Sequence, residues 1–191
     1  DYEDLISLPV LLFRQRPDIL CRYQERYRYC LVDEFQDTNP NQYALIHMLA
    51  SQHQNITVVG DDDQAIYSWR GANVRFLFEF ERDFPTVRTV KLEQNYRSSP
   101  RILSFANRLI QNNRQRKDKT MWTDRQEGEP IILLRTRSRE EEAAQIADLI
   151  LFLRKHHPEW LPLAVLYRIN AQSLHFETEF LSRGISFRIL K

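Results

Sequence analysis

Three short blocks of this 191-residue sequence carry side chains that could do chemistry. They are DEFQDTN at 33–39, GDDDQAIYSWRGA at 60–72 and EQNYRSS at 93–99. Each block follows an apolar run that is typical of a short strand. In α/β proteins the loops after the carboxyl ends of the strands hold the ligand. Together the blocks indicate nucleotide-driven work on a nucleic acid.

The first block begins with two adjacent carboxylates, Asp33 and Glu34. An apolar strand that ends in such a pair is the Walker B arrangement. There the first carboxylate holds Mg²⁺ and the second orients or deprotonates the attacking water. An Asp-Glu pair after a strand is by itself more often a surface turn, so this interpretation depends on the blocks that follow.

The second block places three adjacent carboxylates, Asp61 to Asp63, before Gln64. Adjacent carboxylates repel one another, so we expect a solvated turn, for Asp62 in particular. Gln64 differs because it is neutral. An amide at the ligand end of a strand can sense a γ-phosphate by hydrogen bonding without adding charge, and it can pass that state to the loop that follows.

That loop interleaves two aromatic side chains with a cation: Tyr67, Trp69 and Arg70. This pattern stacks bases and contacts the phosphates of single strands. The alternative is that the aromatic rings are anchors in the core.

The third block contains Tyr96 and Arg97. They could place an aromatic ring beside a nucleobase and a guanidinium beside a γ-phosphate. An arginine supplied by a second lobe makes hydrolysis depend on lobe closure. The alternative is a tyrosine packed in the core at a helix start and an arginine on the surface.

The elements that must position these blocks alternate between strand and helix. Strands are predicted over 27–32, 55–59, 86–92, 130–135, 163–167 and 186–190. Helices are predicted after an Asn39–Gln42 capping box, after Asn73, after Ser99-Pro100, after a Ser138 capping box, and over about 171–183 up to Gly184. Residues 111–129 are expected to be an exposed loop. The fold class is therefore α/β, with two units that meet near residue 95.

Charge is unevenly distributed, although the formal net charge is only +1. Residues 1–95 carry 10 Lys and Arg against 15 Asp and Glu, and residues 96–191 carry 17 against 11. A metal and nucleotide site in the acidic half and phosphate contacts in the basic half would explain this. A merely solvated surface would explain it equally well.

Other features bound the class of protein. Cys21 and Cys30 form no CxxC pair, which favours reduced thiols and a cytoplasmic location. The apolar runs at 5–13 and 131–134 are shorter than the roughly 20 residues that a membrane helix needs, so we expect no membrane association. The chain starts at Asp1 without a signal segment, and we expect it to be part of something larger.

The three blocks together resemble the UvrD/Rep/PcrA branch of superfamily 1 DNA helicases. DYEDL at 1–5 is similar to the segment upstream of Walker B in that family, and AVLYRIN at 164–170 is similar to a motif of its second lobe. Asp62-Asp63 and Trp69 favour this branch over the related RecB/AddA helicase-nucleases. The resemblance covers essentially the whole chain.

The resemblance implies parts of two RecA-like P-loop NTPase lobes, each a parallel sheet flanked by helices. Residues 1–95 would be the later half of the first lobe and 96–191 the early half of the second. ATP and Mg²⁺ would be the cofactors. The implied activity is 3′ to 5′ translocation on single-stranded DNA, with unwinding at duplex junctions, in repair or replication restart.

The same resemblance implies a role for each candidate residue. At the nucleotide, Asp33 would hold Mg²⁺, Glu34 would activate water, and Tyr96 would stack on adenine. Gln64 and Arg97 would contact the γ-phosphate. At the DNA, Tyr67 and Trp69 would contact the single strand, and Arg70 would couple that loop to the nucleotide.

The sequence also departs from the family pattern. It has no GxxxxGK[ST] phosphate loop, so we expect the chain alone to hydrolyse ATP negligibly. Leu174 stands where relatives often have arginine after Gln172-Ser173, which leaves a DNA contact there open. Two alternatives remain: a non-catalytic nucleic-acid-binding or interaction module derived from a helicase, and part of a helicase-nuclease.

Overall fold

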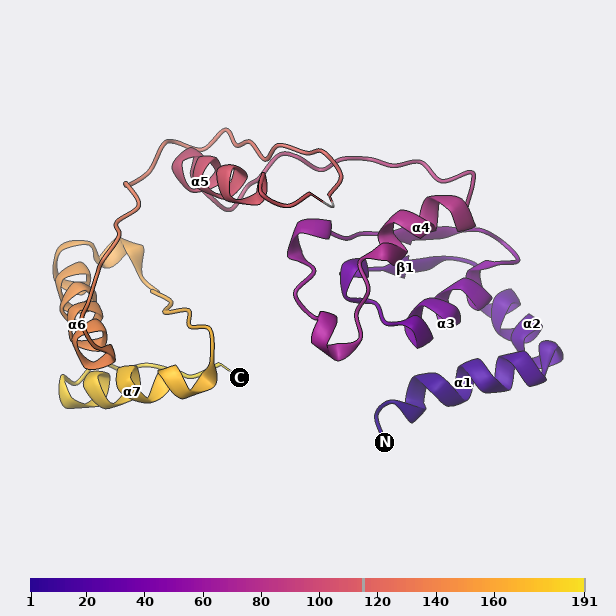
Figure 1. Cartoon of the computed structure of the whole chain (residues 1–191), viewed down its shortest axis with the longest axis horizontal. Helices are drawn as coiled ribbons and strands as arrows, with labels where there is room; N and C mark the ends of the chain where they lie inside the picture. The colour runs from indigo at the N-terminus through magenta and orange to yellow at the C-terminus, as the bar shows by residue number, and fades with distance from the viewer. Residues whose placement is uncertain (115, 191) are drawn as a thin grey trace. The chain divides into compact units, whose positions relative to one another are not determined.

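The computed structural model describes residues 1–114 and 116–190, and the chain forms two compact units (Figure 1). The first unit is Asp1–Pro130 and the second is Ile131–Lys191. The first contains α1 (Asp4–Gln15), α2 (Pro17–Arg26), β1 (Cys30–Val32), α3 (Pro40–Ala50), β2 (Ile56–Val58), α4 (Arg75–Asp83) and α5 (Pro100–Ile110). The second contains α6 (Arg139–His156) and α7 (Ser173–Ser182).

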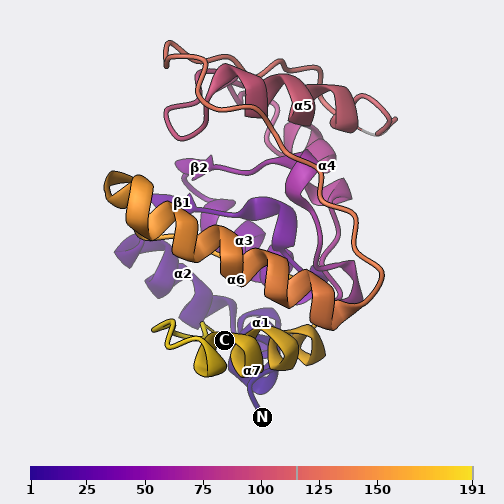
Figure 2. The same cartoon turned by 90° about the vertical axis from the view of Figure 1, so that its left-hand side faces the viewer.

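The two strands of the first unit, β1 and β2, lie side by side and run parallel (Figure 2). Cys30 pairs with Ile56 and Val32 with Val58. Val32, Ile56 and Val58 pack against a buried cluster, whereas the side chain of Leu31, which points to the other face, is 81% exposed. The pair is therefore half-buried, with one packed face.

The cluster under that face is built from α3, α4 and the segments beside them. Its buried members are Phe35, Ala50, Phe80 and Phe84. Phe80 meets Phe35 edge to face at a ring-centroid distance of 5.5 Å, and Tyr43 stacks on Phe76 at 4.3 Å. Aromatic pairs in these geometries add stability beyond the area that they bury. The cluster fixes the loop after β1, because Phe35 is the first residue of that loop to enter the core.

The start of α3 follows the sequence closely. The side chain of Asn39 accepts from the backbone N–H of Gln42 at 2.9 Å, and Gln42 Oε1 accepts from the backbone N–H of Asn39 at 2.9 Å. Pro40 occupies the first helical position, where it needs no donor. The predicted capping box is confirmed.

Four strand predictions are wrong for the residues that the structure describes. Segments 86–92, 130–135, 163–167 and 186–190 carry no strand. An apolar run supplies a face for packing, but a strand also needs a neighbour to bond its N–H and C=O groups. Beyond β1 and β2, the described residues show only an isolated parallel bridge between Gln94 and Trp122.

Helices α1 and α2 were not predicted from the sequence. They contact α3 as well as each other. Gln24 of α2 is buried, and its amide donates to the Met48 carbonyl at 2.7 Å and to the Ser51 hydroxyl at 3.1 Å. These bonds tie α2 to the end of α3.

The second unit is a pair of helices. Ala143 and Ala147 of α6 are fully buried against Phe176 and Phe180 of α7, because small side chains let the second helix approach. Gly184 has φ +64°, and the Ile185 N–H bonds back to the Phe180 carbonyl at 2.8 Å. This is the glycine stop that the sequence predicts. Among the described residues of both units, no helix is long and apolar enough to cross a membrane.

Candidate functional site

The loop after β1 begins with Asp33 and Glu34, and both side chains are exposed. The Glu34 backbone N–H donates to Asp33 Oδ1 at 2.9 Å. Glu34 has φ 51° and ψ 42°, in the left-handed region that non-glycine residues rarely adopt. Such conformations persist where the surroundings enforce them, and they concentrate at functional sites.

Gln36 connects this loop to the loop after β2. It is buried, its Nε2 donates to Glu34 Oε2 at 2.8 Å, and its Oε1 accepts the backbone N–H of Asp61 at 3.0 Å. One amide therefore joins the carboxylate of the first block to the start of the second block. A buried amide satisfied on both ends fixes the relative position of the two loops.

Gly60 makes this junction sterically possible. A Cβ at position 60 would lie 3.0 Å from Gln36 Oε1, 3.3 Å from the Gln36 backbone nitrogen and 3.3 Å from Phe35 Cβ. A side chain at this position would push the two loops apart. The glycine is there for close approach rather than for an unusual backbone angle.

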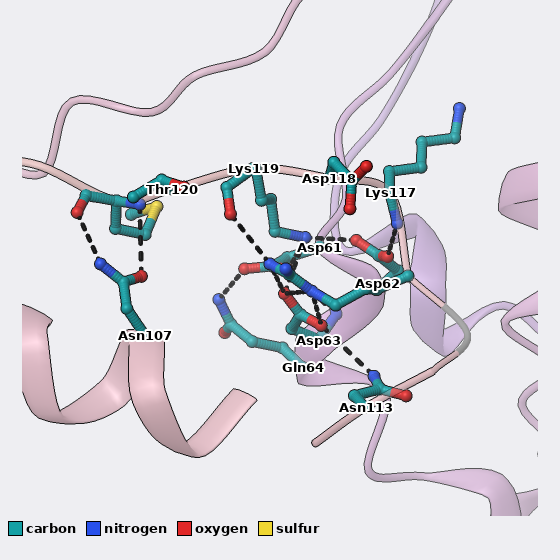
Figure 3. A network of polar contacts seen from close by, with 12 residues as sticks. Asp61, Asp62, Asp63, Gln64, Asn107, Asn113, Lys117, Asp118, Lys119 and Thr120 are labelled. Carbon is teal, nitrogen blue, oxygen red and sulfur yellow. Dashed lines mark hydrogen bonds and ion pairs between the residues drawn. The ribbon is translucent and has the colours of Figure 1, made fainter. Parts of the chain in front are cut away.

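The three carboxylates after Gly60 do not form a solvated turn (Figure 3). Asp62 is buried and Asp63 is largely buried. Arg116 and Lys119, from the predicted loop 111–129, pair with them. The prediction of a solvated turn is therefore wrong, because cations far along the sequence compensate the repulsion. Residues 116–119 carry no helix or strand, as predicted, but Arg116, Lys117 and Lys119 are only partly exposed.

These pairings shift the pKa values of the groups involved. Burial raises the pKa of the Asp61 carboxyl, but hydrogen bonds from Lys119 and Gln64 outweigh it, so this pKa lies below its ordinary value. For Asp63, hydrogen bonds from Arg116 and Lys119 likewise outweigh burial and lower the pKa. Burial lowers the pKa of Lys119, but the three carboxylates raise it by more than burial lowers it. The pKa of Lys119 therefore lies above its ordinary value. All three groups are held in their charged forms.

Gln64 follows the carboxylates in the same turn. Its side chain is exposed, and its Nε2 donates to Asp61 Oδ2 at 2.7 Å. Asp61 therefore bonds Gln64 through its side chain and Gln36 through its backbone. Glu34, Gln36, Asp61 and Gln64 form one continuous hydrogen-bonded chain.

The turn at Ser68–Arg70 holds the aromatic residues predicted to bind nucleic acid. Trp69 is 71% exposed, so it is not a core anchor, whereas Tyr67 is half-buried. The Arg70 guanidinium lies 4.6 Å from the Trp69 ring centroid and 5.1 Å from that of Tyr67. The three side chains thus form one cation–π cluster, in which Trp69 and Arg70 are exposed.

Tyr96 and Arg97 lie just before the start of α5. Tyr96 is 75% exposed, and its hydroxyl donates to Gln94 Oε1 at 2.8 Å. Arg97 lines a hollow of about 720 Å³ beside the start of α5. The other residues that line it are Ser98, Ser99, Ile102, Asp124, Arg125, Gln126 and Gly128. The alternative of a tyrosine packed in the core is wrong for Tyr96.

The structure joins some of the predicted residues and leaves others apart. Glu34 and Gln64 belong to one hydrogen-bonded chain, and Tyr67, Trp69 and Arg70 to one cluster. Within the described part of the chain, no hydrogen bond or ion pair links Tyr96 or Arg97 to either group. The sequence interpretation missed Lys119 and Arg116. The signal was there, since three adjacent carboxylates need compensating cations and the run RQRKDK at 114–119 is the densest basic segment.

The loop after β1 offers the donor set that Mg²⁺ prefers, which is carboxylate oxygen. Asp33 is exposed at the end of a strand, and Asp37 Oδ1 is buried with no hydrogen-bond partner among the described residues. A buried carboxylate oxygen without a partner is costly unless a ligand completes it. The residues present therefore fit a cation bound at this loop.

Family models match both halves of the chain. A family model described as the UvrD/REP helicase N-terminal domain matches residues 1–85, and one described as the UvrD-like helicase C-terminal domain matches residues 90–191. The chain belongs to the UvrD/Rep helicase family. The candidate residues of this UvrD-like chain are divided between the two matched domains, with Asp33 to Arg70 in the first and Tyr96 and Arg97 in the second.

Curated relatives of this UvrD-like chain are helicases. The ATP-dependent DNA helicase PcrA of Leuconostoc citreum is 43% identical over 191 residues, and that of Staphylococcus aureus strain Mu50 is 40% identical over 190 residues. A probable DNA helicase II homolog of Rickettsia felis is 44% identical over 191 residues. All of this chain is covered in each comparison, but it spans only 26%, 26% and 29% of these relatives.

Proposed function

We propose that this chain is part of an ATP-dependent 3′ to 5′ DNA helicase that couples ATP hydrolysis to translocation on single-stranded DNA and to unwinding at duplex junctions. The PcrA of Leuconostoc citreum is named an ATP-dependent DNA helicase, so that relative uses ATP and acts on DNA. The observation that carries the proposal is the hydrogen-bonded chain from Glu34 through Gln36 and Asp61 to Gln64.

We infer a nucleotide role for each candidate residue, and the hydrogen-bonded chain supports those of Glu34 and Gln64. Asp33 would hold Mg²⁺, which would neutralise phosphate charge. Glu34, exposed and held by Gln36, would accept a proton from the attacking water. Gln64 would contact the γ-phosphate with the exposed end of its amide. Tyr96 would stack on adenine and Arg97 would reach the γ-phosphate, with residues 1–95 and 96–191 as parts of two RecA-like lobes.

The DNA roles follow from the exposed cluster. Tyr67 and Trp69 would stack on the bases of single-stranded DNA, and Arg70 would couple this turn to the nucleotide. Participation in repair or replication restart and a cytoplasmic location remain proposals of the same kind. The 191-residue chain alone is expected to hydrolyse ATP negligibly, because it has no GxxxxGK[ST] sequence.

A non-catalytic binding module derived from a helicase is the second candidate. The exposed Trp69 favours it, since base stacking needs no nucleotide chemistry. Under this alternative DNA would bind, but ATP would not be hydrolysed. A nuclease motif elsewhere in the native protein would instead indicate a helicase-nuclease.

The deciding experiment is ATP hydrolysis by the native full-length protein, with and without single-stranded DNA. Glu34→Gln is expected to lower DNA-stimulated kcat by about 10²- to 10⁴-fold, because it removes the general base. Glu25→Gln, an exposed glutamate of α2, is the matched control and should leave kcat unchanged. DNA binding without any hydrolysis in the unchanged protein would reject the helicase proposal and leave the binding module.

A further inference from the structure

Residues 116–119 contact a turn that lies in a different matched domain. The turn, Asp61 to Asp63, falls within the N-terminal helicase domain match, whereas 116–119 falls within the C-terminal one. Both belong to the first compact unit, and Figure 3 shows the two segments facing each other across a dense set of bonds.

Lys119 lies at the centre of these contacts. Its ammonium is 2.7 Å from Asp61 Oδ1 and 3.2 Å from Asp63 Oδ2, and it also bonds Asp62 Oδ1. Oxygens of the three carboxylates lie within 4.8 Å of one another, a spacing that suits a cation. The ammonium of Lys119, whose side chain is only 18% exposed, supplies the positive charge there.

Arg116 holds Lys119 in place. Its guanidinium bonds both carboxylate oxygens of Asp63, at 2.9 Å from Nη2 and 3.1 Å from Nε, and its Nη2 also donates to the Lys119 carbonyl at 3.0 Å. The Lys117 backbone N–H donates to Asp62 Oδ2 at 2.6 Å. The segment is thus anchored at both ends, so the Lys119 side chain approaches the turn from a fixed direction.

The contact of Lys119 with Asp61 links it to the residues proposed to act in ATP hydrolysis. Asp61 Oδ1 accepts from Lys119, its Oδ2 accepts from Gln64, and its backbone N–H donates to Gln36. Gln36 in turn holds Glu34. Lys119, which belongs to the C-terminal match, is therefore linked to Gln64 through Asp61, and to Glu34 through Asp61 and Gln36.

We propose that Lys119 is a positioning residue for ATP hydrolysis, which fixes Asp61 and through it the side chains of Gln64 and Glu34. This inference rests on the proposed function. In this role Lys119 would act through Asp61 rather than on the substrate. Without its charge, three neighbouring carboxylates would repel one another and the turn would open, so Asp61 would no longer orient the Gln64 amide.

The test uses the native full-length protein with saturating single-stranded DNA. Lys119→Ala is expected to lower kcat by about 10- to 100-fold, because small displacements of reacting groups have effects of this size. The KM for ATP should change little. Lys119→Arg, which retains the charge, should restore much of kcat.

Lys117→Ala is the matched control. It removes the same charge two residues away, where the Lys117 ammonium pairs with Glu81 at 2.5 Å and the backbone bond to Asp62 is preserved. Its kcat should stay within about twofold of the unchanged protein. A loss of kcat in Lys119→Ala that does not exceed the loss in Lys117→Ala would overturn the inference.

A double substitution separates positioning from a merely structural role. If Lys119 acts through Asp61 and Gln64, then Gln64→Ala should reduce kcat much less in the Lys119→Ala protein than in the Lys117→Ala protein. Equal reductions in the two backgrounds would reject the proposed path. If Lys119→Ala does not melt cooperatively, Lys119→Gln, which keeps a neutral donor one bond closer to the backbone, is judged by the same criteria.

Failure of the proposed function would be visible separately. An unchanged protein that shows no DNA-stimulated hydrolysis would reject the helicase proposal before any variant is compared. An active unchanged protein with an equally active Lys119→Ala variant would reject only the role of Lys119.

Discussion

The turns at 61–64 and 67–70 are neighbours in sequence but are held in different ways. The first is bonded to Gln36, Arg116 and Lys119, which are distant along the chain. The second is held by its own members. Arg70 lies over the rings of Tyr67 and Trp69, and the backbone hydrogen bonds of this turn join residues within 67–72. One turn is fixed by the rest of the unit, and the other is fixed mainly by itself.

This difference matches the ligands that the two turns would meet. A phosphate and its attacking water have one productive geometry, so the groups that serve them need to be preorganised. A single strand presents varied bases, and an exposed stacking surface tolerates that variety. Four predictions test whether the two turns are separable, in order of decreasing expected effect.

The largest effect concerns the second turn. Trp69→Ala should weaken binding of single-stranded DNA by about 5- to 150-fold, which corresponds to the loss of one base stack. Fluorescence anisotropy with a labelled oligonucleotide measures it. Trp160→Ala, at another partly exposed tryptophan, is the control and should not change affinity. An equal loss of DNA affinity in both variants would contradict the proposed DNA contact of Trp69.

The next effect concerns the first turn. Gly60→Ala should reduce the free energy of unfolding by about 1–3 kcal/mol, because the new Cβ is forced against Gln36. Urea denaturation measures it, and DNA-independent hydrolysis should fall as well. Gly71→Ala meets nothing within 4 Å, and its φ of +85° makes it a control for backbone strain alone. A fall in hydrolysis of the same size in Gly71→Ala would mean that the turns are not separable.

Acid should loosen the first turn. The folded-state pKa values of Asp61 and Asp63 lie below the ordinary 3.8. Their contribution to stability is therefore complete above that pH and is lost as the pH falls through the lower, folded-state values. Urea denaturation between pH 2 and about 7 should show a smaller acid dependence for Asp63→Asn than for the unchanged protein. An unaltered acid dependence would argue against the ion pairs around Lys119.

The smallest effect on stability is expected at Arg70. Arg70→Gln removes two exposed cation–π contacts, so the free energy of unfolding should fall by at most about 1 kcal/mol. DNA stimulation of hydrolysis should nevertheless decline if Arg70 couples the turns. A markedly larger loss in a urea titration would show that the second turn is bound to the rest of the unit after all.

The sequence predicted the local features well. Asn39 with Gln42 is a capping box, Gly184 ends α7, and Asp33 and Glu34 follow a parallel strand, as predicted. These features depend on residues within a few positions of one another, so short-range rules are sufficient to find them.

Long-range features were less accessible. The segments 86–92 and 163–167 have the apolar character of strands, but a strand also depends on a partner that composition does not specify. Likewise, the burial of Asp62 depends on Lys119, 57 residues away. The roles of all the candidate residues, from Asp33 to Arg97, stay predictions.

The amide of Gln36 has a direction. Its nitrogen faces the carboxylate of Glu34 and its oxygen faces the N–H of Asp61. Reversing it would set oxygen against carboxylate and nitrogen against N–H. Glutamate at position 36 lacks the donor, lysine lacks the acceptor, and asparagine is one methylene too short to keep both bonds. Position 36 therefore admits almost no substitute, although its side chain need never touch a ligand.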